Sequence, residues 1–203
     1  MALFDVTADD GVLDLARELV GLFRRHFFDA ATGALGEFFT EDWLPAQGNA
    51  GAHVEPGHLY EWVWLLREYQ DRTGEDLGAE RAALYRFANA HGIDSATGLV
   101  FDLVDRDGTA RRRSSRLWPQ TEALRAHLVI GGEETEARAV QVVENMLRRY
   151  FAWNPRGTWM DQFGPDGEAI ADKIPGSSFY HALGAYAELH RVIHGRGTEL
   201  RPA

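Results

Sequence analysis

The side chains best suited to proton-transfer chemistry in this sequence are two histidines and a nearby glutamate. His58 and Glu61 are three residues apart, so a helix would place them on one face. His181 lies in another stretch of helical character. Moving a proton at a carbon beside a carbonyl needs a base and an acid, and histidine titrates nearest to neutral pH. The pattern predicts His58, His181 and Glu61 as catalytic residues, with Glu61 fixing an imidazole or holding a substrate hydroxyl.

Polar and aromatic residues complete a candidate pocket. They lie beside these three residues in the sequence or at the equivalent position of a third predicted helix. Aromatic rings cover the C–H faces of a sugar, while amides and carboxylates bind its hydroxyls. The sequence therefore predicts a substrate-binding set for a small sugar. Its members are Trp62, Trp118, Gln120, Glu122 and Tyr180.

The elements that must position these residues are helices, and the predicted fold class is all-α. Apolar residues recur at helical spacing in six segments. Three connections between them share an Asp or Asn, a glycine and a short β-like run, and two of these are followed by a second turn signal, which predicts small hairpins. The predicted helices are 9–28, 58–72, 78–90, 119–130, 133–151 and 177–193, the connections are 29–39, 94–103 and 154–163, and the turns are Asp107-Gly108 and Asp166-Gly167.

The connections repeat with the period of a helix pair. Gly33, Gly98 and Gly157 recur roughly every 60 residues. Three units of outer helix, long loop and inner helix are predicted, and repeats place equivalent positions side by side. The starts of the three inner helices, and with them His58 and His181, should therefore meet at one rim.

Several of these residues have simpler interpretations. His58 can cap a helix start, His181 can be a hydrogen-bonded core residue, and Glu61 can be solvated. Trp62 and Trp64 can belong to the core rather than to a pocket. A metal site formed by the two histidines and Glu61 is disfavoured, because the sequence offers no further ligand at a recognisable spacing.

Composition limits the remaining function classes. The chain has 203 residues, a formal net charge of -10 and no cysteine. The charge disfavours nucleic acid and anionic membranes as partners, and without cysteine there is no thiolate or disulfide chemistry. No apolar run reaches the ~18 residues of a membrane span, and no secretory signal is recognisable, so a cytoplasmic location is expected. The basic cluster at 111–116 is either a solvated loop or a contact to phosphate or a sugar acid.

Three motifs resemble the N-acylglucosamine 2-epimerase superfamily, most closely its aldose–ketose isomerase branch of mannose isomerases and sulfoquinovose isomerase. They are EPGHLYEWVWLL at 55–66, RLWPQTEAL at 116–124 and KIPGSSFYHALGAYAEL at 173–189. They occur in the family's order and spacing, and the resemblance covers nearly the whole chain. The family fold is an (α/α)6 barrel.

The resemblance implies a role for each matching residue. His58 and His181 resemble the family's two acid/base histidines, and Glu61 resembles the carboxylate that supports the first of them. The implied chemistry moves a proton between C1 and C2 of an opened sugar through a cis-enediol, with no metal or redox cofactor. Trp118, Gln120 and Glu122 match the motif that lines the substrate pocket.

The chain departs from this family in supplying three helix pairs where the barrel has six. It is expected to form one partial domain over 1–203, the C-terminal half of the barrel. The open half should expose two apolar flanks that favour a second copy or a complementing N-terminal half as a partner. Alone, it is expected to have little isomerase activity.

Three function classes remain open. The first is an aldose–ketose isomerase of the mannose and fructose type, or a sugar 2-epimerase. The second is a glycoside hydrolase or lyase with Glu61 and Glu122 as its two carboxylates, which would leave both histidines without a role. The third is an inactive half-barrel or sugar-binding module that needs a partner half.

Overall fold

The computed structural model describes residues 1–153 and 155–195 and confirms the expected all-helical architecture. In this part of the chain the long helices follow the predicted segments to within a few residues, and a short first helix was not predicted. The helices are α1 (Ala2–Thr7), α2 (Asp10–Leu22), α3 (Pro56–Thr73), α4 (Gly78–His91), α5 (Leu117–Ile130), α6 (Glu133–Asn145) and α7 (Gly176–Gly195).

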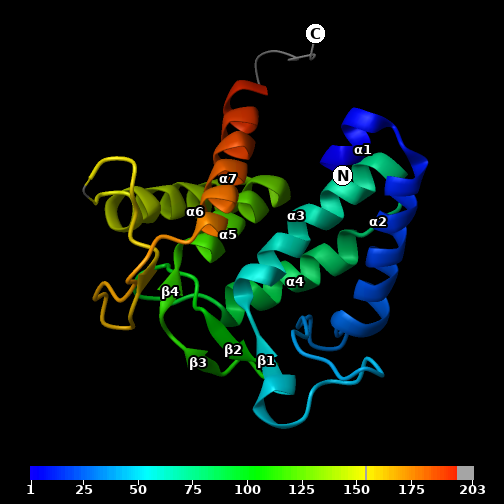
Figure 1. Cartoon of the computed structure of the whole chain (residues 1–203), viewed down its shortest axis with the longest axis horizontal. Helices are drawn as coiled ribbons and strands as arrows, with labels where there is room; N and C mark the ends of the chain where they lie inside the picture. The colour runs from blue at the N-terminus through cyan, green and yellow to red at the C-terminus, as the bar shows by residue number, and fades with distance from the viewer. Residues whose placement is uncertain (154, 196–203) are drawn as a thin grey trace.

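The helices form an inner row and an outer row. Helix α5 packs against α3 on one side and α7 on the other, while α4 packs against α3 and α6 against α5 (Figure 1). Helix α5 is the most enclosed, since polar residues on it are buried together with its apolar ones. The expected arrangement of inner helices α3, α5 and α7, alternating along the chain with outer helices, is confirmed.

Local chemistry explains where several helices begin and end. The Asp9 side chain accepts a hydrogen bond from the Gly11 N–H and caps α2. Helix α3 begins with Pro56, whose ring suits a first turn, and ends at Gly74 with a positive φ of 75°. Helices α2 and α6 each continue into a π-helical turn, η1 (Phe23–Phe27) and η3 (Met146–Tyr150), which accounts for the longer runs expected there.

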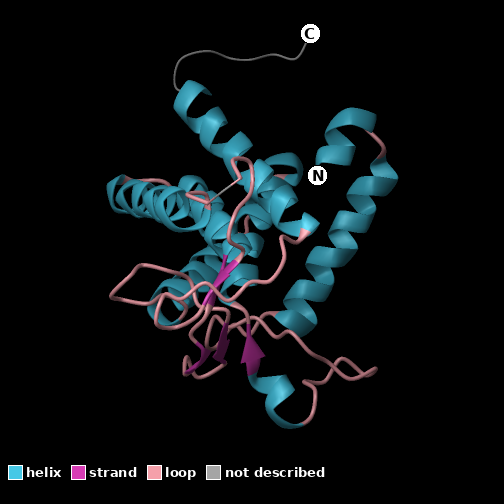
Figure 2. Cartoon of the chain, turned by 60° about the vertical axis from the view of Figure 1, so that its left-hand side comes forward, coloured by secondary structure: helices cyan, strands magenta, loops and turns pink. Residues whose placement is uncertain are grey.

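Short strands tie the long connections together at one end of the helices (Figure 2). Strand β1 (His53–Val54) pairs antiparallel with β2 (Leu103–Asp105), which pairs with β3 (Ala110–Arg112). Strand β4 (Ser115–Arg116) pairs with β5 (Gln162–Phe163). A 3-10 turn, η2 (Gly48–Ala52), leads into β1. Because β1 and β4 end just before α3 and α5, this pairing fixes where two inner helices start.

The repeated Asp-to-Gly connection has the same structure in its first two copies. The Gly33 N–H donates to the Asp29 carbonyl, and the Gly98 N–H donates to the Asp94 carbonyl, each at 2.7 Å. Both glycines have positive φ, 81° and 72°, which is a conformation that glycine adopts without strain. In the third copy Asn154 lies outside the described residues.

The predicted hairpins are also present. Asp107-Gly108 forms the turn between β2 and β3, and the Gly108 N–H donates to the Asp105 carbonyl. Asp166-Gly167 lies in a turn closed by an antiparallel bridge between Phe163 and Ala169. Turn chemistry encoded in a few neighbouring residues was therefore sufficient to predict both.

Two apolar clusters stabilise the described helices. The first lies between α2, α3 and α4 and includes Phe23, Leu59 and Leu84, all fully buried. The second lies between α5, α6 and η3 and includes Leu124 and Tyr150. Burial of each large apolar side chain contributes about 1.5–3 kcal/mol, so α3 and α5 are held firmly.

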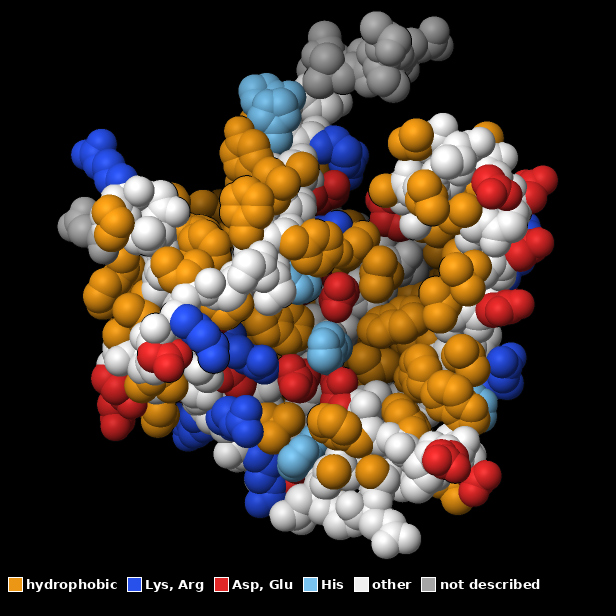
Figure 3. Space-filling view, viewed as in Figure 1, with side chains coloured by type: hydrophobic (Ala, Val, Ile, Leu, Met, Phe, Trp, Pro, Cys, Tyr) orange, Lys and Arg blue, Asp and Glu red, His pale blue; other side chains and the backbone are white. Residues whose placement is uncertain are grey.

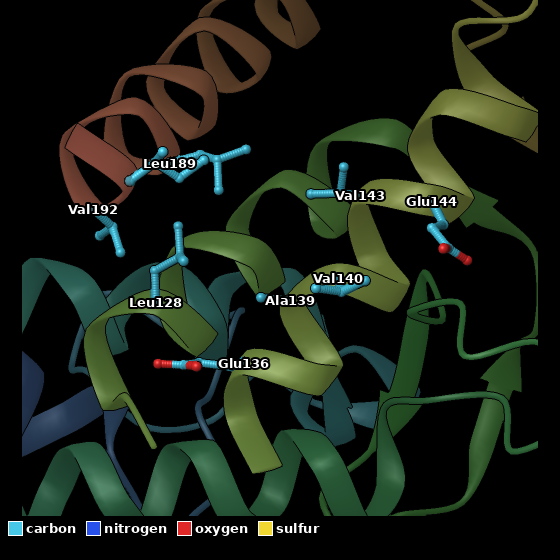
Figure 4. Close-up of a pocket in the computed structure, with 9 residues that line it drawn as sticks. Leu128, Glu136, Ala139, Val140, Val143, Glu144, Leu189 and Val192 are labelled. Carbon is cyan, nitrogen blue, oxygen red and sulfur yellow. The ribbon is translucent and has the colours of Figure 1, made fainter. Parts of the chain in front are cut away.

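Helix α7 is packed on one side only. Among its described residues, large apolar side chains at Phe179, Leu183, Tyr186 and Ile193 are exposed. A groove of about 500 Å³ runs between α6 and α7, with Leu128 of α5 at its floor (Figure 4). The opposite edge exposes apolar side chains of α1 and α2. They are Leu3, Val6, Leu15 and Leu19. Of the helices described, none is both long and apolar enough to cross a membrane.

Candidate active site

The starts of the three inner helices bring the predicted histidines together around one indole. The Trp118 ring centroid lies 4.9 Å from that of His58 and 5.4 Å from that of His181. These residues come from α5, α3 and α7, each near the helix N-terminus. Figure 3 shows histidine and acidic side chains gathered in the hollowed centre of this face, beside hydrophobic ones. We refer to this region as the two-histidine cleft.

His58 is held by a glutamate that the sequence did not single out. Glu37, in the loop before β1, has one oxygen 2.9 Å from Nδ1 of His58. Its other oxygen accepts a hydrogen bond from the Glu55 N–H at 3.0 Å, which fixes the carboxylate at the entry to α3. Burial lowers the pKa of His58, but Glu37 and the charges of Glu55 and Glu61 outweigh it, so the pKa lies above its usual value.

His181 is held by a carboxylate buried among helices. Glu122 is completely buried, and one of its oxygens lies 2.8 Å from Nδ1 of His181. The other oxygen accepts the indole N–H of Trp64 at 2.5 Å and lies 3.6 Å from Arg125. Arg125 in turn stacks over the Trp64 ring at 3.2 Å. A cation, an N–H donor and an imidazole together compensate the buried charge.

Glu61 lies near both histidines but forms an ion pair with neither of them in the described part of the chain. Its carboxylate falls within 4.8 Å of ligand atoms of Glu122 and His181. Burial raises the pKa of Glu61, and the Glu122 charge raises it further, against the opposing effects of His58 and His181. The expected support of the His58 imidazole therefore comes from Glu37, and Glu61 is left to face the cleft.

An aromatic cavity of about 400 Å³ opens beside His58. Glu37 is the acidic residue in its lining, and the ring of Trp62 stacks on Phe23 with centroids 4.5 Å apart. Trp62 therefore serves the core on one face and lines the cavity with the other. Four aromatic side chains contribute to the lining. They are Phe27, Phe39, Trp43 and Trp62.

Two of the predicted substrate-binding residues, Gln120 and Tyr180, differ in burial and in hydrogen bonding. Gln120 is buried, and its amide bonds the Val100 N–H and carbonyl, the Ser115 hydroxyl and the Arg116 carbonyl. Its hydrogen-bonding groups thus hold the connection before α5, and the structure does not bring a free amide to the cleft. Tyr180 is 58% exposed, and its ring lies edge-on to His181 at 4.8 Å, at the margin of the cleft.

The basic cluster is mostly engaged in ion pairs. Arg116 donates to Asp102 at 3.0 Å and to Glu55 at 2.8 Å, and its guanidinium lies over the Trp118 ring. Arg111 pairs with Asp105, and Arg113 pairs with Asp94. These pairs support the interpretation of the cluster as a structural and solvated one.

Sequence reasoning missed Glu37 and the roles of Trp64 and Arg125. Glu37 lies 21 residues before His58, in a connection with no helical periodicity to align it. Trp64 was interpreted as a core residue, and its indole N–H does point inward to Glu122. The available signal was Arg125, three residues after Glu122, a spacing that permits an ion pair on one helix.

The arrangement suits proton transfer. Each imidazole has Nδ1 anchored by a carboxylate, and among the described residues neither Nε2 is hydrogen-bonded. Glu61, Glu122 and His181 also form the one group close enough to hold a metal in this part of the chain. However, both Glu122 oxygens and Nδ1 of His181 are already bonded within the protein. That donor set favours a hydrogen-bonded network over a metal centre.

Fold and cleft together define a protein of paired α-helices with two carboxylate-anchored imidazoles beside aromatic rings. The model of the N-acylglucosamine 2-epimerase (GlcNAc 2-epimerase) family matches residues 1–185. The chain belongs to this family, as its three motifs indicated.

Relatives and solved structures agree with that assignment. The chain is 36% identical over 187 residues to a protein of Rhizobium meliloti (strain 1021) named mannose-6-phosphate isomerase, covering 89% of this chain and 48% of that one. It is 27% identical to the D-mannose isomerase of Pseudomonas cannabina pv. alisalensis, covering 91% and 50%. A crystal structure of D-mannose isomerase superposes with a TM-score of 0.78 at 21% identity, covering 93% of this chain and 52% of that one.

The chain thus spans about half the length of the relatives it matches. The structures of D-mannose isomerase and of a cellobiose 2-epimerase are (α/α)6 barrels of this family, and the described helices superpose on about half of such a barrel. The expected fold class, half of an (α/α)6 barrel with short β-hairpins in its long loops, is confirmed.

Proposed function

We propose that this chain carries the acid/base part of a sugar isomerase that interconverts an aldose and a ketose of the mannose and fructose type. The observation that carries the proposal is the placement of His58 and His181 against the same Trp118 ring, each with a carboxylate on Nδ1. Two imidazoles near one indole, each with an Nε2 that is not hydrogen-bonded to the described residues, provide a base and an acid for a cis-enediol intermediate. The names of the relatives support mannose as the aldose.

Binding of the open-chain sugar falls to the groups around this pair. Trp62 and Trp118 offer ring faces to the C–H surface of the sugar, and Tyr180 offers one at the margin. Glu61 faces the cleft as an acceptor for a sugar hydroxyl, and Glu122 acts by holding His181. No cofactor is needed for these proton transfers.

The alternative reaction is epimerisation at C2. It uses the same two histidines but returns the proton to the opposite face of C2. The name of the family whose model matches the chain favours keeping this alternative.

The decisive experiment is hydrogen exchange at C2 of mannose and at C1 of fructose in deuterated water, followed by NMR. The full chain is compared with His58→Ala and His181→Ala. Exchange that is present in the chain and lost in both variants supports the proposal. Formation of fructose from mannose distinguishes the isomerase, and formation of glucose distinguishes the epimerase. Exchange retained in either variant contradicts the assigned pair.

The exposed apolar faces at the two edges of the half-barrel raise the question of whether the chain is active alone. We propose that 1–203 forms one partial domain, the C-terminal half of a barrel, and that the exposed apolar faces of α7 and of α1–α2 are covered by a complementing N-terminal half. The expected result is weak hydrogen exchange with little turnover by the chain alone, and full turnover after addition of such a half. Robust turnover by the monomeric chain would contradict it. A second copy covering these edges would appear as a dimer in sedimentation equilibrium.

A further inference from the structure

The two imidazole–carboxylate pairs of the cleft have unequal surroundings. The Glu122 carboxylate is shared between His181, the Trp64 indole and Arg125. The Glu37 carboxylate is shared between His58 and the backbone N–H of Glu55, and neither of these is a permanent cation. A hydrogen-bonded carboxylate without a cationic neighbour favours a positive charge on its imidazole more strongly than one already paired.

The other groups that face His58 add to this difference. From the chain entering α3 comes Glu55, whose charge is partly offset by Arg116. From α3 itself comes Glu61. From α5 comes the neutral Trp118 ring, which lies against both His58 and His181 of α7. The charged neighbours of His58 are therefore predominantly acidic.

We propose that Glu37 is the positioning residue that keeps His58 protonated, with Nδ1–H on Glu37 and Nε2–H free to donate, so that His58 is the proton donor to the substrate oxygen. Removal of the proton on carbon then falls to His181. This assignment rests on the proposed function and gives each histidine a separate role, with His58 as the acid and His181 as the base. The direction of the His58 pKa shift agrees with it.

The resulting steps balance. His181 Nε2 takes the proton from C2 of the open aldose while His58 Nε2–H gives its proton to the aldehyde oxygen, which yields the enediol. His181 then returns its proton to C1, and His58 Nε2 recovers a proton from the C2 hydroxyl, which yields the ketose. Both histidines end in their starting protonation states.

The test is a histidine titration followed by ¹H–¹⁵N NMR on the full chain, comparing the wild type with Glu37→Gln. The glutamine keeps an oxygen for the Glu55 N–H but removes the charge. We expect the pKa of His58 to fall by about one unit or more. Glu41→Gln is the matched control, because it removes the same charge from an exposed position of the same loop and should leave His58 unchanged.

A titration of His58 that is the same in Glu37→Gln and in the wild type, with circular dichroism unchanged, overturns the inference. If Glu37→Gln does not fold, the wild type still tests it, because ¹⁵N shifts of both ring nitrogens at neutral pH report whether His58 is doubly protonated. A singly protonated ring contradicts the inference. Hydrogen exchange at C2 is scored separately, so an inactive chain with the expected titration refutes the proposed function and leaves the Glu37–His58 assignment standing.

Discussion

The two corners of the cleft are built in different ways. The His181 corner is made by three packed helices, with Glu122 of α5 in contact with Trp64 of α3 and His181 of α7. The His58 corner depends on a loop, because Glu37 lies in the long connection before β1. Glu122 therefore stabilises the packing of the helices, whereas Glu37 mainly affects the charge of His58.

The largest expected effect comes from removing the scaffold carboxylate. Glu122→Ala should lower the free energy of unfolding by about 3–5 kcal/mol, since it leaves Arg125 buried without its counterion and the Trp64 N–H without an acceptor. Glu37→Ala removes a carboxylate that is partly exposed and should cost about 1 kcal/mol. Urea unfolding followed by circular dichroism measures both. Equal losses in the two variants would contradict the distinction between the corners.

A smaller effect is expected when the indole N–H is removed. Trp64→Phe should cost about 1.5–3 kcal/mol, because the hydrogen bond it deletes has a charged and fully buried acceptor in Glu122. Trp62→Phe is the matched control, in which the stacked contact with Phe23 is largely kept. Its loss should be about 1 kcal/mol or less. The same unfolding measurement compares the two, and a costlier Trp62→Phe would reverse the assignment.

The smallest effect concerns the residue between the corners. Burial and the Glu122 charge raise the pKa of Glu61, so its ionised form is disfavoured in the folded protein. Glu61→Gln should therefore stabilise the protein by about 0.5–1 kcal/mol at pH 8. The gain should disappear below the usual value of 4.5, where Glu61 is protonated in both states. Unfolding curves at pH 4 and pH 8 check the sign, and a variant less stable at pH 8 would contradict it.

Much of the architecture was predictable because the signals are local. Helix extents followed from apolar spacing, and the turns at Gly33 and Gly98 followed from an Asp and a glycine four residues apart. The repeat of these turns along the chain also predicted that α3 and α7 begin at the same rim, which places His58 near His181. The π-helical turns were not predicted, since they extend the same apolar pattern as an α-helix.

The partners of the site residues required the tertiary structure. His58 and Glu61 share a helix face, and that spacing allowed Glu61 either to fix the imidazole or to hold a substrate hydroxyl. In the structure Nδ1 of His58 is bonded to Glu37, which lies in a loop. Gln120 was predicted to bind substrate, yet the path of the connection before α5 uses its amide. Both contacts join segments about 20 residues apart in the chain, which the spacing of neighbouring residues does not encode.

The sequence by itself determined the helices and the repeated connections, because hydrogen bonds and burial patterns within a few residues encode them. The tertiary structure alone decided which carboxylate serves which imidazole and how its charge is compensated. Those contacts join residues 21 to 59 positions apart, and their geometry depends on how helices and loops pack together.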